Sequence, residues 1–262
     1  QEMMPPGLTS IVRMARVALL AGACSSLAAC AGLGANPRDP LEPVNRKVMA
    51  FNEGVDAVVL KPSATFYREK VPAPVRTGVS NFFGNLTDVW SAVNSLLQFK
   101  LQDAAVNCTR FSLNTVFGVF GVFDLASDLN IERHREDFGQ TLGRWGVPTG
   151  PFVMLPLLGP STLRDTVALP VDRLGNPITY SSDHATPRNS LYVLKAVDTR
   201  ANLLRASNVL DEIALDKYSF IRDAHLQRRR AETLESGDRG GDAGADGDAQ
   251  SPAEAASPAP QR

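Results

Sequence analysis

Apolar residues recur with the period of an α-helix along most of the chain from residue 39 to residue 232. The first repeat advances in alternating steps of four and three residues and comprises Val44, Val48, Phe51, Val55 and Val58. This spacing predicts an amphipathic helix, because side chains three and four residues apart share one helix face. Lys61 and Pro62 are expected to end this helix, since proline lacks the backbone donor that a helix interior needs.

The same periodicity predicts two helices in the next part of the chain. The first is expected over about residues 73–85. The second is expected to begin with Asp88 as its N-terminal cap, with an inward-facing stripe that consists of Val89, Val93, Leu96 and Leu97. After a short break at residues 98–100, a further helix carries Cys108 on its apolar stripe, where it is expected to be a small packed core residue.

The C-terminal part of the chain is predicted to be helical and then disordered. Candidate caps for three further helices are Ser161, Asn189 and Asn208. The last helix is expected over about residues 217–232, with the arginine run 228–230 as its solvated end. Residues 233–262 form an acidic tail rich in proline and alanine, and disorder is expected there because no large apolar residue follows Glu235.

Two uncharged segments interrupt the helical pattern. The longer one lies between Arg144 and Arg164 and has nearly the length of a membrane-spanning helix, about 20 residues. Four prolines fall inside it, so no straight helix can run through it. We expect a bent apolar loop or hairpin that is held by neighbouring helices. On this stretch alone, contact with lipid and burial in a soluble core are equally good readings.

The shorter uncharged segment runs from Phe111 to Phe123, and four of its thirteen residues are phenylalanine. Gly118 and Gly121 loosen its backbone and allow close approach of other groups. As a helix it would be only about 20 Å long, which is short of the ~30 Å hydrocarbon core of a bilayer. It can therefore enter a membrane without crossing it. The alternative is a core strand or a buried turn, but two such segments in one chain favour lipid contact.

Residues 1–29 have the three parts of an export signal. Arg13 and Arg16 precede a short apolar run, and small residues lead up to a cysteine. The apolar run is too short to span a bilayer. The alternative is an anchor that is not cleaved.

The end of this signal resembles a bacterial lipobox. The residues at 27–30 are Leu-Ala-Ala-Cys, so Cys30 is the expected lipid attachment site. Several acyl chains on one cysteine give stable anchoring, whereas a single chain is marginal. Ala31 follows the cysteine, and the absence of an aspartate there favours the outer membrane. Residues 30–38 are then expected to be a lipidated tether, since small and flexible residues predominate.

Charge and motif content argue against several functional classes. The chain has 27 basic and 28 acidic residues, so no overall field points to a nucleic-acid partner. The histidines and cysteines are scattered, so no metal site is expected. Ser161 lacks the Gly-x-Ser-x-Gly context of a hydrolase nucleophile. We therefore expect neither an enzyme nor a bound cofactor.

Several stretches, taken in order, resemble the MlaA (VacJ) family of outer-membrane lipoproteins. They are DPLEPVNRKVMAFN at 39–52, KPSATFYREKVPAPVRTGVSNFFGNL at 61–86, VNSLLQ at 93–98, RFSLNTVFGVFGVFDLAS at 110–127, EDFGQTLGRWGVPTGPFVMLPLLGPSTLRD at 136–165 and KYSFIRDAHLQRR at 217–229. The resemblance covers essentially the whole predicted folded region, so residues 39–232 are expected to form one MlaA-like helical domain. The acidic tail has no counterpart in it.

The resemblance implies an all-α fold in which helices form a ring within one leaflet of the outer membrane. The ring would enclose a central amphipathic channel and have no full transmembrane span. Such proteins take mislocalised phospholipids from the outer leaflet, sit beside a trimeric porin, and pass lipid to a soluble periplasmic phospholipid carrier. The implied function is retrograde intermembrane phospholipid transport, which maintains outer-membrane lipid asymmetry. The implied location is the periplasmic face of the cell outer membrane, with a lipid anchor.

Residues 145–160 are expected to form a gate or rim at this channel, because glycine and proline keep them non-helical where lipid must pass. The gate residues are Trp145, Gly146, Gly150, Pro151, Phe152, Met154, Leu155, Pro156, Gly159 and Pro160. Polar residues are expected to line the channel, and the candidates are Asn81, Asn85, Asn94, Asn114 and Thr115. Interior asparagines also serve as caps or packed amides, which is the alternative for this second set.

Two other functional classes fit the same sequence. A lipoprotein scaffold could join porins to periplasmic partners without moving lipid. A membrane-attached lipid hydrolase could act on the same molecules. Outer-leaflet phospholipid in a deletion strain separates transport from the scaffold, and release of fatty acid by the purified protein would indicate the hydrolase.

Overall fold

The computed structural model describes residues 39–238. The predicted signal peptide, Cys30, the tether up to residue 38 and residues 239–262 lie outside this part of the chain. The described helices are α2 (Glu42–Val55), α3 (Lys61–Lys70), α4 (Ala73–Leu97), α5 (Leu101–Val116), α6 (Leu125–Asp128), α7 (Phe138–Arg144), α8 (Leu163–Gly175), α9 (Ala185–Ile213) and α10 (Lys217–Asp238). A π-helical turn η1 (Asp56–Leu60) and a 3-10 turn η2 (Pro177–Tyr180) join some of them.

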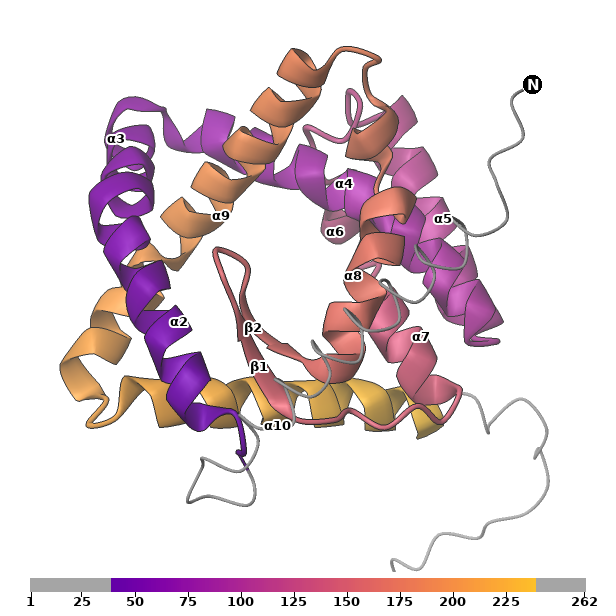
Figure 1. The fold of residues 1–262 in the computed structure, drawn as a ribbon. Coiled ribbons are helices and arrows are strands. Elements are labelled where there is room, and N and C mark those ends of the chain that lie inside the picture. Colours follow the sequence, from indigo (N-terminus) through magenta and orange to yellow (C-terminus); the bar gives the residue numbers. More distant parts are fainter. Residues whose placement is uncertain (1–38, 239–262) are drawn as a thin grey trace, which may run out of the picture.

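A single antiparallel hairpin forms the sheet of the described region. Strand β1 (Phe152–Leu155) pairs with β2 (Gly159–Thr162), with Phe152 opposite Thr162 and Leu155 opposite Gly159. The bent apolar segment predicted between Arg144 and Arg164 therefore contains a hairpin, as expected. Helices α2, α3, α4, α8 and α10 follow a ring-like outline, and the hairpin extends from beside α10 into the middle of that outline (Figure 1).

The predicted all-α class and ring-shaped arrangement are confirmed. Within residues 39–238, every helix is either too short or too polar to cross a bilayer. Helix α9 packs along α3 and crosses α4, and α5 packs against the outer side of α4 (Figure 1). The predicted break at residues 98–100 is also confirmed, because α4 ends at Leu97 and α5 begins at Leu101.

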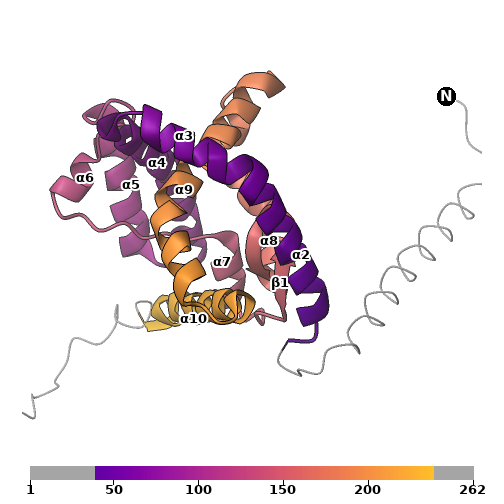
Figure 2. The ribbon, with the colours of Figure 1, turned by 90° about the vertical axis from the view of Figure 1, so that its left-hand side faces the viewer.

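The predicted helix end at Lys61 and Pro62 is wrong. Helix α2 continues through η1 into α3, and the three elements form one oblique rod along the ring (Figure 2). The π-helical turn explains the continuity, since the Lys61 backbone N–H donates to the Asp56 carbonyl five residues earlier. Pro62 then lies in the first turn of α3, where the missing N–H of a proline costs nothing.

Four predicted helix caps are also wrong. Asp88 lies in the middle of the uninterrupted α4, and Asn189 and Asn208 lie inside α9, which is a single helix. Helix α8 is capped by Thr162, whose hydroxyl accepts from the Asp165 N–H, and not by the predicted Ser161. Sequence alone overvalued asparagine and aspartate as caps, because these residues here make tertiary contacts or face outward.

The helices bury polar side chains and expose apolar ones. On α4, the predicted inward-facing residues Val93, Leu96 and Leu97 are exposed, whereas Asn94 and Gln98 are fully buried. The prediction that this stripe faces inward is therefore wrong. Helical periodicity identifies an apolar stripe but not the medium that it meets, and in lipid the apolar stripe faces outward.

Helix α2 shows the same inversion. Val44 and Phe51 are 46% and 54% exposed, whereas Asn45 is only 2% exposed. The amphipathic stripe predicted for this helix exists, but Val44, Phe51 and Val58 of it form an outer surface, and Val48 packs partly against the Met49 and Phe152 cluster. On α5, Cys108 is exposed and not the packed core residue that was predicted.

A charged cluster replaces the usual apolar core between α4 and α5. Asp88 on α4 is fully buried and pairs with Arg133, with 2.9 Å between Nε and Oδ1. Arg110 on α5 is 1% exposed, and its Nη2 atom lies 2.8 Å from Oδ1 of Asp124. The Arg110 guanidinium also donates to the Ile131 carbonyl, so this one side chain joins α5 to the loop that follows it.

The phenylalanine-rich segment is neither a core strand nor a buried turn. Residues 117–123 form a series of turns, and Phe117, Phe120 and Phe123 are 69%, 72% and 59% exposed. Gly121 adopts φ +87°, and an added Cβ atom would lie 2.5 Å from the Asn85 side chain. Only glycine fits this close approach, so the turn holds its phenylalanines outward.

The last helix departs from two predictions. Helix α10 extends to Asp238, beyond the predicted helix end at about residue 232. Arg229, which was expected at a solvated helix end, is buried and lies 2.7 Å from Asp137 and 2.8 Å from Asp165. It thereby ties α10 to α7 and α8.

Candidate functional site

The β-hairpin is attached to α2 through two asparagine side chains. The Asn45 amide donates to the Phe152 carbonyl at 3.0 Å and accepts from the Met154 N–H at 2.9 Å. One step further along the strand, Asn52 donates to the Leu155 carbonyl at 2.9 Å and accepts from the Leu157 N–H at 2.8 Å. Asn45 thus satisfies one donor and one acceptor on the open edge of β1, and Asn52 satisfies the last carbonyl of β1 and one donor of the turn.

The spacing of these asparagines matches the strand. Seven residues of helix rise by about 10.5 Å, and three residues of strand span about 10 Å. Asn45 and Asn52 therefore meet successive edge positions of β1 without distortion. A two-stranded hairpin alone is only marginally stable. Helix α2 takes the place of a third strand here, and we call this pair of residues the asparagine clamp.

The base of the hairpin lies in a small apolar core. Phe152, Met154, Met49 and Tyr218 form one buried cluster between β1, α2 and α10. The Phe152 ring meets the Tyr218 ring edge-on, with 6.0 Å between the centroids. The base is therefore fixed to two helices of the ring.

The turn of the hairpin is exposed and strained. Leu157 and Leu158 are 62% and 70% exposed. Leu157 adopts φ +63° and Gly159 adopts φ +86°, so a leucine occupies a backbone conformation that favours glycine. Strain of this kind persists where the surrounding structure imposes it, and it is concentrated at functional segments. The turn lies inside the ring outline (Figure 1).

The predicted gate residues separate into three groups. Trp145 and Gly146 end α7, where the Trp145 indole donates to the Leu97 carbonyl at 3.1 Å. Phe152 and Met154 are buried at the hairpin base. The remaining members approach or form the hairpin, and they are Gly150, Pro151, Leu155, Pro156, Gly159 and Pro160. The hairpin arm therefore extends from a fixed base to an exposed turn, and its gate role stays a prediction.

The predicted channel-lining asparagines are mostly packed amides. Asn85, Asn94 and Asn114 are 0–2% exposed. Asn85 donates to the Thr115 hydroxyl at 2.9 Å, and Asn114 donates to Asp124 at 2.8 Å. These buried side chains join α4, α5 and the following loop, so the structure does not place them on an open lining. Asn81 and Thr115 are partly exposed, and a lining role for these two stays a prediction.

Two cations, Lys195 on α9 and Arg135 in the 129–137 loop, influence each other electrostatically. Lys195 on α9 is half-buried and lies in the field of Arg135. Among the described residues, neither side chain makes an ion pair with an acid. Burial and the neighbouring Arg135 charge both lower the pKa of Lys195. Uncompensated positive charge of this kind favours an anionic ligand such as phosphate.

Sequence reasoning missed the asparagine clamp and the cation pair. The clamp had a detectable signal, since Asn45 and Asn52 lie seven residues apart next to the apolar stripe of α2. Lys195 had none, because a single lysine in a helix resembles any solvent-facing lysine until Arg135 is placed beside it.

Replacing Asn45 by alanine is expected to destabilise the protein by about 1–3 kcal/mol, because the Phe152 carbonyl and the Met154 N–H lose their buried partner. The Asn52→Ala variant is expected to speed hydrogen exchange at the Leu157 amide with a smaller loss of stability. Asn208→Ala, at an exposed position of α9, is the matched control. Thermal unfolding in detergent and amide exchange by mass spectrometry check this. Equal exchange at Leu157 in all three variants would contradict the clamp.

Comparisons with known proteins agree with the fold. The sequence profile of the MlaA lipoprotein family matches residues 37–232. The chain is 36% identical over 220 residues to the "Intermembrane phospholipid transport system lipoprotein MlaA" of Escherichia coli (strain K12), which covers 81% of this chain and 86% of that protein. The protein of the same name from Haemophilus influenzae is 34% identical over 202 residues, covering 72% of this chain and 76% of that protein.

A solved structure shares the architecture. It is described as "Structural basis for maintenance of bacterial outer membrane lipid asymmetry" and superposes with a TM-score of 0.65 at 36% identity. The match covers 74% of this chain and 98% of the solved one. Profile, sequence relatives and structure agree over nearly the whole described region. The chain belongs to the MlaA lipoprotein family.

Proposed function

We propose that this protein takes mislocalised phospholipids from the outer leaflet of the outer membrane and passes them towards the periplasm, as part of an intermembrane phospholipid transport system. The observation that carries the proposal is the inverted burial of the helices. Apolar stripes on α2 and α4 face outward, whereas amides and charges face inward. A phospholipid has a charged head and apolar tails, so its path needs polar groups inside an apolar exterior.

The depth of the protein in the membrane follows from the same surface. The exposed apolar side chains include those of the 117–123 turns, and no helix in residues 39–238 is suited to a full span. A body of this kind rests in one leaflet with its apolar rim in hydrocarbon. The predicted lipid on Cys30 would add a covalent anchor, and the outer-membrane location is part of this proposal.

The hairpin is the proposed gate. Its base is fixed by the Phe152 cluster, and its Leu157–Leu158 turn is exposed inside the ring outline. The asparagine clamp holds this arm against α2. Release of the Asn52 end would let the turn move while the base stays in place. Asn52→Ala is therefore expected to change the rate of lipid passage, and unchanged passage with a demonstrably mobile turn would argue against the gate.

Partner proteins belong to the same proposal. The relatives are named as members of a transport system, which supports a soluble periplasmic phospholipid carrier as the receiver. A trimeric porin as a neighbour in the membrane rests on the family resemblance. The exposed apolar rim offers the surface for such a neighbour.

A deletion strain tests the function directly. We expect outer-leaflet phospholipid to accumulate, measured with an amine-reactive reagent that does not cross the membrane, and sensitivity to detergent to rise. The full-length chain should reverse both effects. Unchanged surface phospholipid would favour the non-transporting scaffold, and release of fatty acid from phospholipid by the purified protein would favour a hydrolase.

A further inference from the structure

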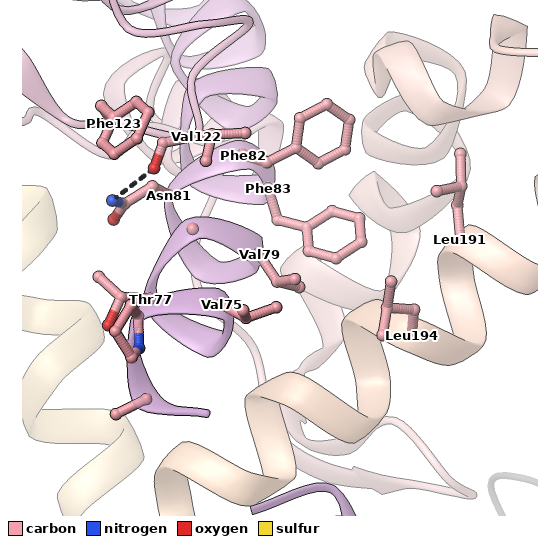
Figure 3. A pocket seen from close by; sticks show the side chains of 13 residues that line it. Val75, Thr77, Val79, Asn81, Phe82, Phe83, Val122, Phe123, Leu191 and Leu194 are labelled. Atoms are coloured by element: carbon pink, nitrogen blue, oxygen red, sulfur yellow. Dashed lines mark hydrogen bonds between the residues drawn. The ribbon is translucent and has the colours of Figure 1, made fainter. Parts of the chain in front are cut away.

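An apolar cleft opens between α4 and α9 on the far side of their crossing point. The two helices touch where the Ser80 hydroxyl donates to Asp198 at 2.8 Å. Towards the N-terminus of α9 they diverge. Val79 and Phe82 of α4 extend into the gap towards Leu191 of α9 (Figure 3). The cleft has a volume of about 810 Å³ and is lined by thirteen residues.

The lining is almost entirely apolar. Its residues include Val75, Val79, Phe82, Phe123, Leu191 and Leu194. The Asn81 amide is one of the few polar groups at the cleft, and it donates to the Val122 carbonyl at 3.0 Å. Its hydrogen-bonding capacity is therefore partly used within the protein. A cavity of this size and character is typical of a ligand site for an apolar molecule.

The cleft continues into the apolar outer surface. Val122 and Phe123 line it and also belong to the exposed 117–123 turns. An apolar molecule can therefore reach the cleft from the hydrocarbon of the membrane without crossing a polar barrier. The chain's own residues 239–262 are not a suitable occupant, because their sequence contains no large apolar residue.

Positive charge lies one helical turn from the cleft. Lys195 follows Leu191 by four residues, so both lie on the same face of α9. The exposed Arg135 is near enough to act electrostatically on Lys195, and neither side chain makes an ion pair with an acid among the described residues. An anionic group attached to an apolar chain would satisfy both features at once. The phosphate and acyl chains of a phospholipid have this arrangement.

We propose that the cleft between α4 and α9 holds one fatty acyl chain of a phospholipid, with the phosphate at Lys195 and Arg135. This inference rests on the proposed transport function and adds a side entrance to it. The lipid enters between two helices from the membrane, tail first along Phe123 and Phe82. The other acyl chain stays in the bilayer or on the outer apolar surface until the head group is bound.

Photocrosslinking in the full-length protein tests the proposal. A benzophenone amino acid replaces Leu191, which lines the cleft, or Val193, which is 63% exposed two residues away and does not line it. The detergent-solubilised protein is mixed with a phospholipid that carries tritium in its acyl chains. Labelling is expected at 191 and only weakly at 193. Equal labelling at both positions would mean that the acyl chains contact the apolar surface of α9 without entering the cleft, and this result would overturn the proposal.

The charge at Lys195 provides a second readout. Lys195→Glu is expected to weaken labelling at 191 about tenfold, the change that loss of one charge-assisted hydrogen bond produces. Lys195→Arg should keep it. Diacylglycerol, which lacks the phosphate, should compete about tenfold less well than phospholipid for the same reason. If Lys195→Glu leaves labelling at 191 unchanged and diacylglycerol competes as well as phospholipid, the proposed phosphate site at Lys195 and Arg135 is wrong.

Two further outcomes would each identify a different occupant. A crosslink at 191 to another protein in whole membranes would make the cleft a protein docking surface. Labelling that occurs only after Cys30→Ala would mean that the protein's own anchor fills it. Either result overturns the proposed acyl-chain site. The surface phospholipid of the deletion strain is measured independently, so the acyl-chain site and the transport function are tested separately.

Discussion

Replacing Arg110 by methionine is expected to destabilise the folded protein by about 3–5 kcal/mol, the cost of removing one partner from a buried ion pair. Arg110 is almost completely buried, and its guanidinium contacts both Asp124 and the Ile131 carbonyl. Methionine replaces the aliphatic part of the arginine side chain but carries no charge. The carboxylates of Asp88 and Asp124 then have Arg133 as their one remaining cationic partner in this cluster. Thermal unfolding of the detergent-solubilised protein, followed by circular dichroism, measures the loss.

Arg68→Met is the matched control for this experiment. Arg68 lies on the exposed side of α3, so its replacement should change the free energy of unfolding by less than about 0.5 kcal/mol. Adding Asp88→Asn to the Arg110→Met protein should recover part of the lost stability, because two carboxylates, Asp88 and Asp124, would otherwise share the single cation of Arg133. If Arg110→Met unfolds at the temperature of the Arg68→Met control, the charged cluster does not hold α4 and α5 together.

The loss in the Arg110→Met protein should depend on pH. Burial raises the pKa of Asp88, so the folded state takes up a proton at this carboxyl before the unfolded state does. A group with a raised pKa of this kind stabilises the folded state as the pH falls towards the ordinary aspartate range. Without Arg110 this pKa should rise further. The stability difference from the wild type should therefore narrow between about pH 7 and pH 4, and a constant difference would contradict a charge effect.

Reversing the charge of Lys195 is expected to abolish lipid transport without unfolding the protein. In Lys195→Glu, the new carboxylate would pair with Arg135 and repel phosphate, so the local positive field is lost. Cells that carry this variant should accumulate outer-leaflet phospholipid as the deletion strain does. The variant should unfold at the wild-type temperature or above it, because the substitution replaces repulsion between residue 195 and Arg135 by attraction.

Two variants complete this test. Lys195→Arg keeps the positive charge and should restore normal surface phospholipid. Lys47→Glu makes the same charge change at an exposed position of α2 and should have no effect. Normal surface phospholipid in the Lys195→Glu strain, at wild-type protein levels, would remove the cation pair from the lipid path.

The sequence was most informative where prolines and glycines restrict the backbone. The four prolines between Arg144 and Arg164 excluded a straight helix, and the structure has a hairpin there. The break at residues 98–100 was also predictable. The helix end predicted at Pro62 is wrong, because the π-helical turn Asp56–Leu60 directly before α3 lets the helix continue through the proline, and this turn has no local sequence signal.

Periodicity located the apolar stripes but could not orient them. Val93 and Leu96 were assigned to a core because soluble helices bury such residues, yet they are exposed, and Asn94 beside them is buried. The partners of Asn94 and Asp88 come from distant parts of the chain, as in the contacts with Thr141 and Arg133. A single sequence does not reveal which polar residues will meet, so a polar core is hard to foresee.

The asparagine clamp has a consequence for how this family can vary. Asn45 and Asn52 bind only main-chain atoms of the hairpin, and the amide of any residue at those positions except proline offers the same groups. The side chains of Val153 and Leu155 are therefore free to change in size or chemistry while the arm stays docked. Substitutions at Val153 and Leu155 should therefore leave the hairpin docked on α2, with the anchoring helix left untouched.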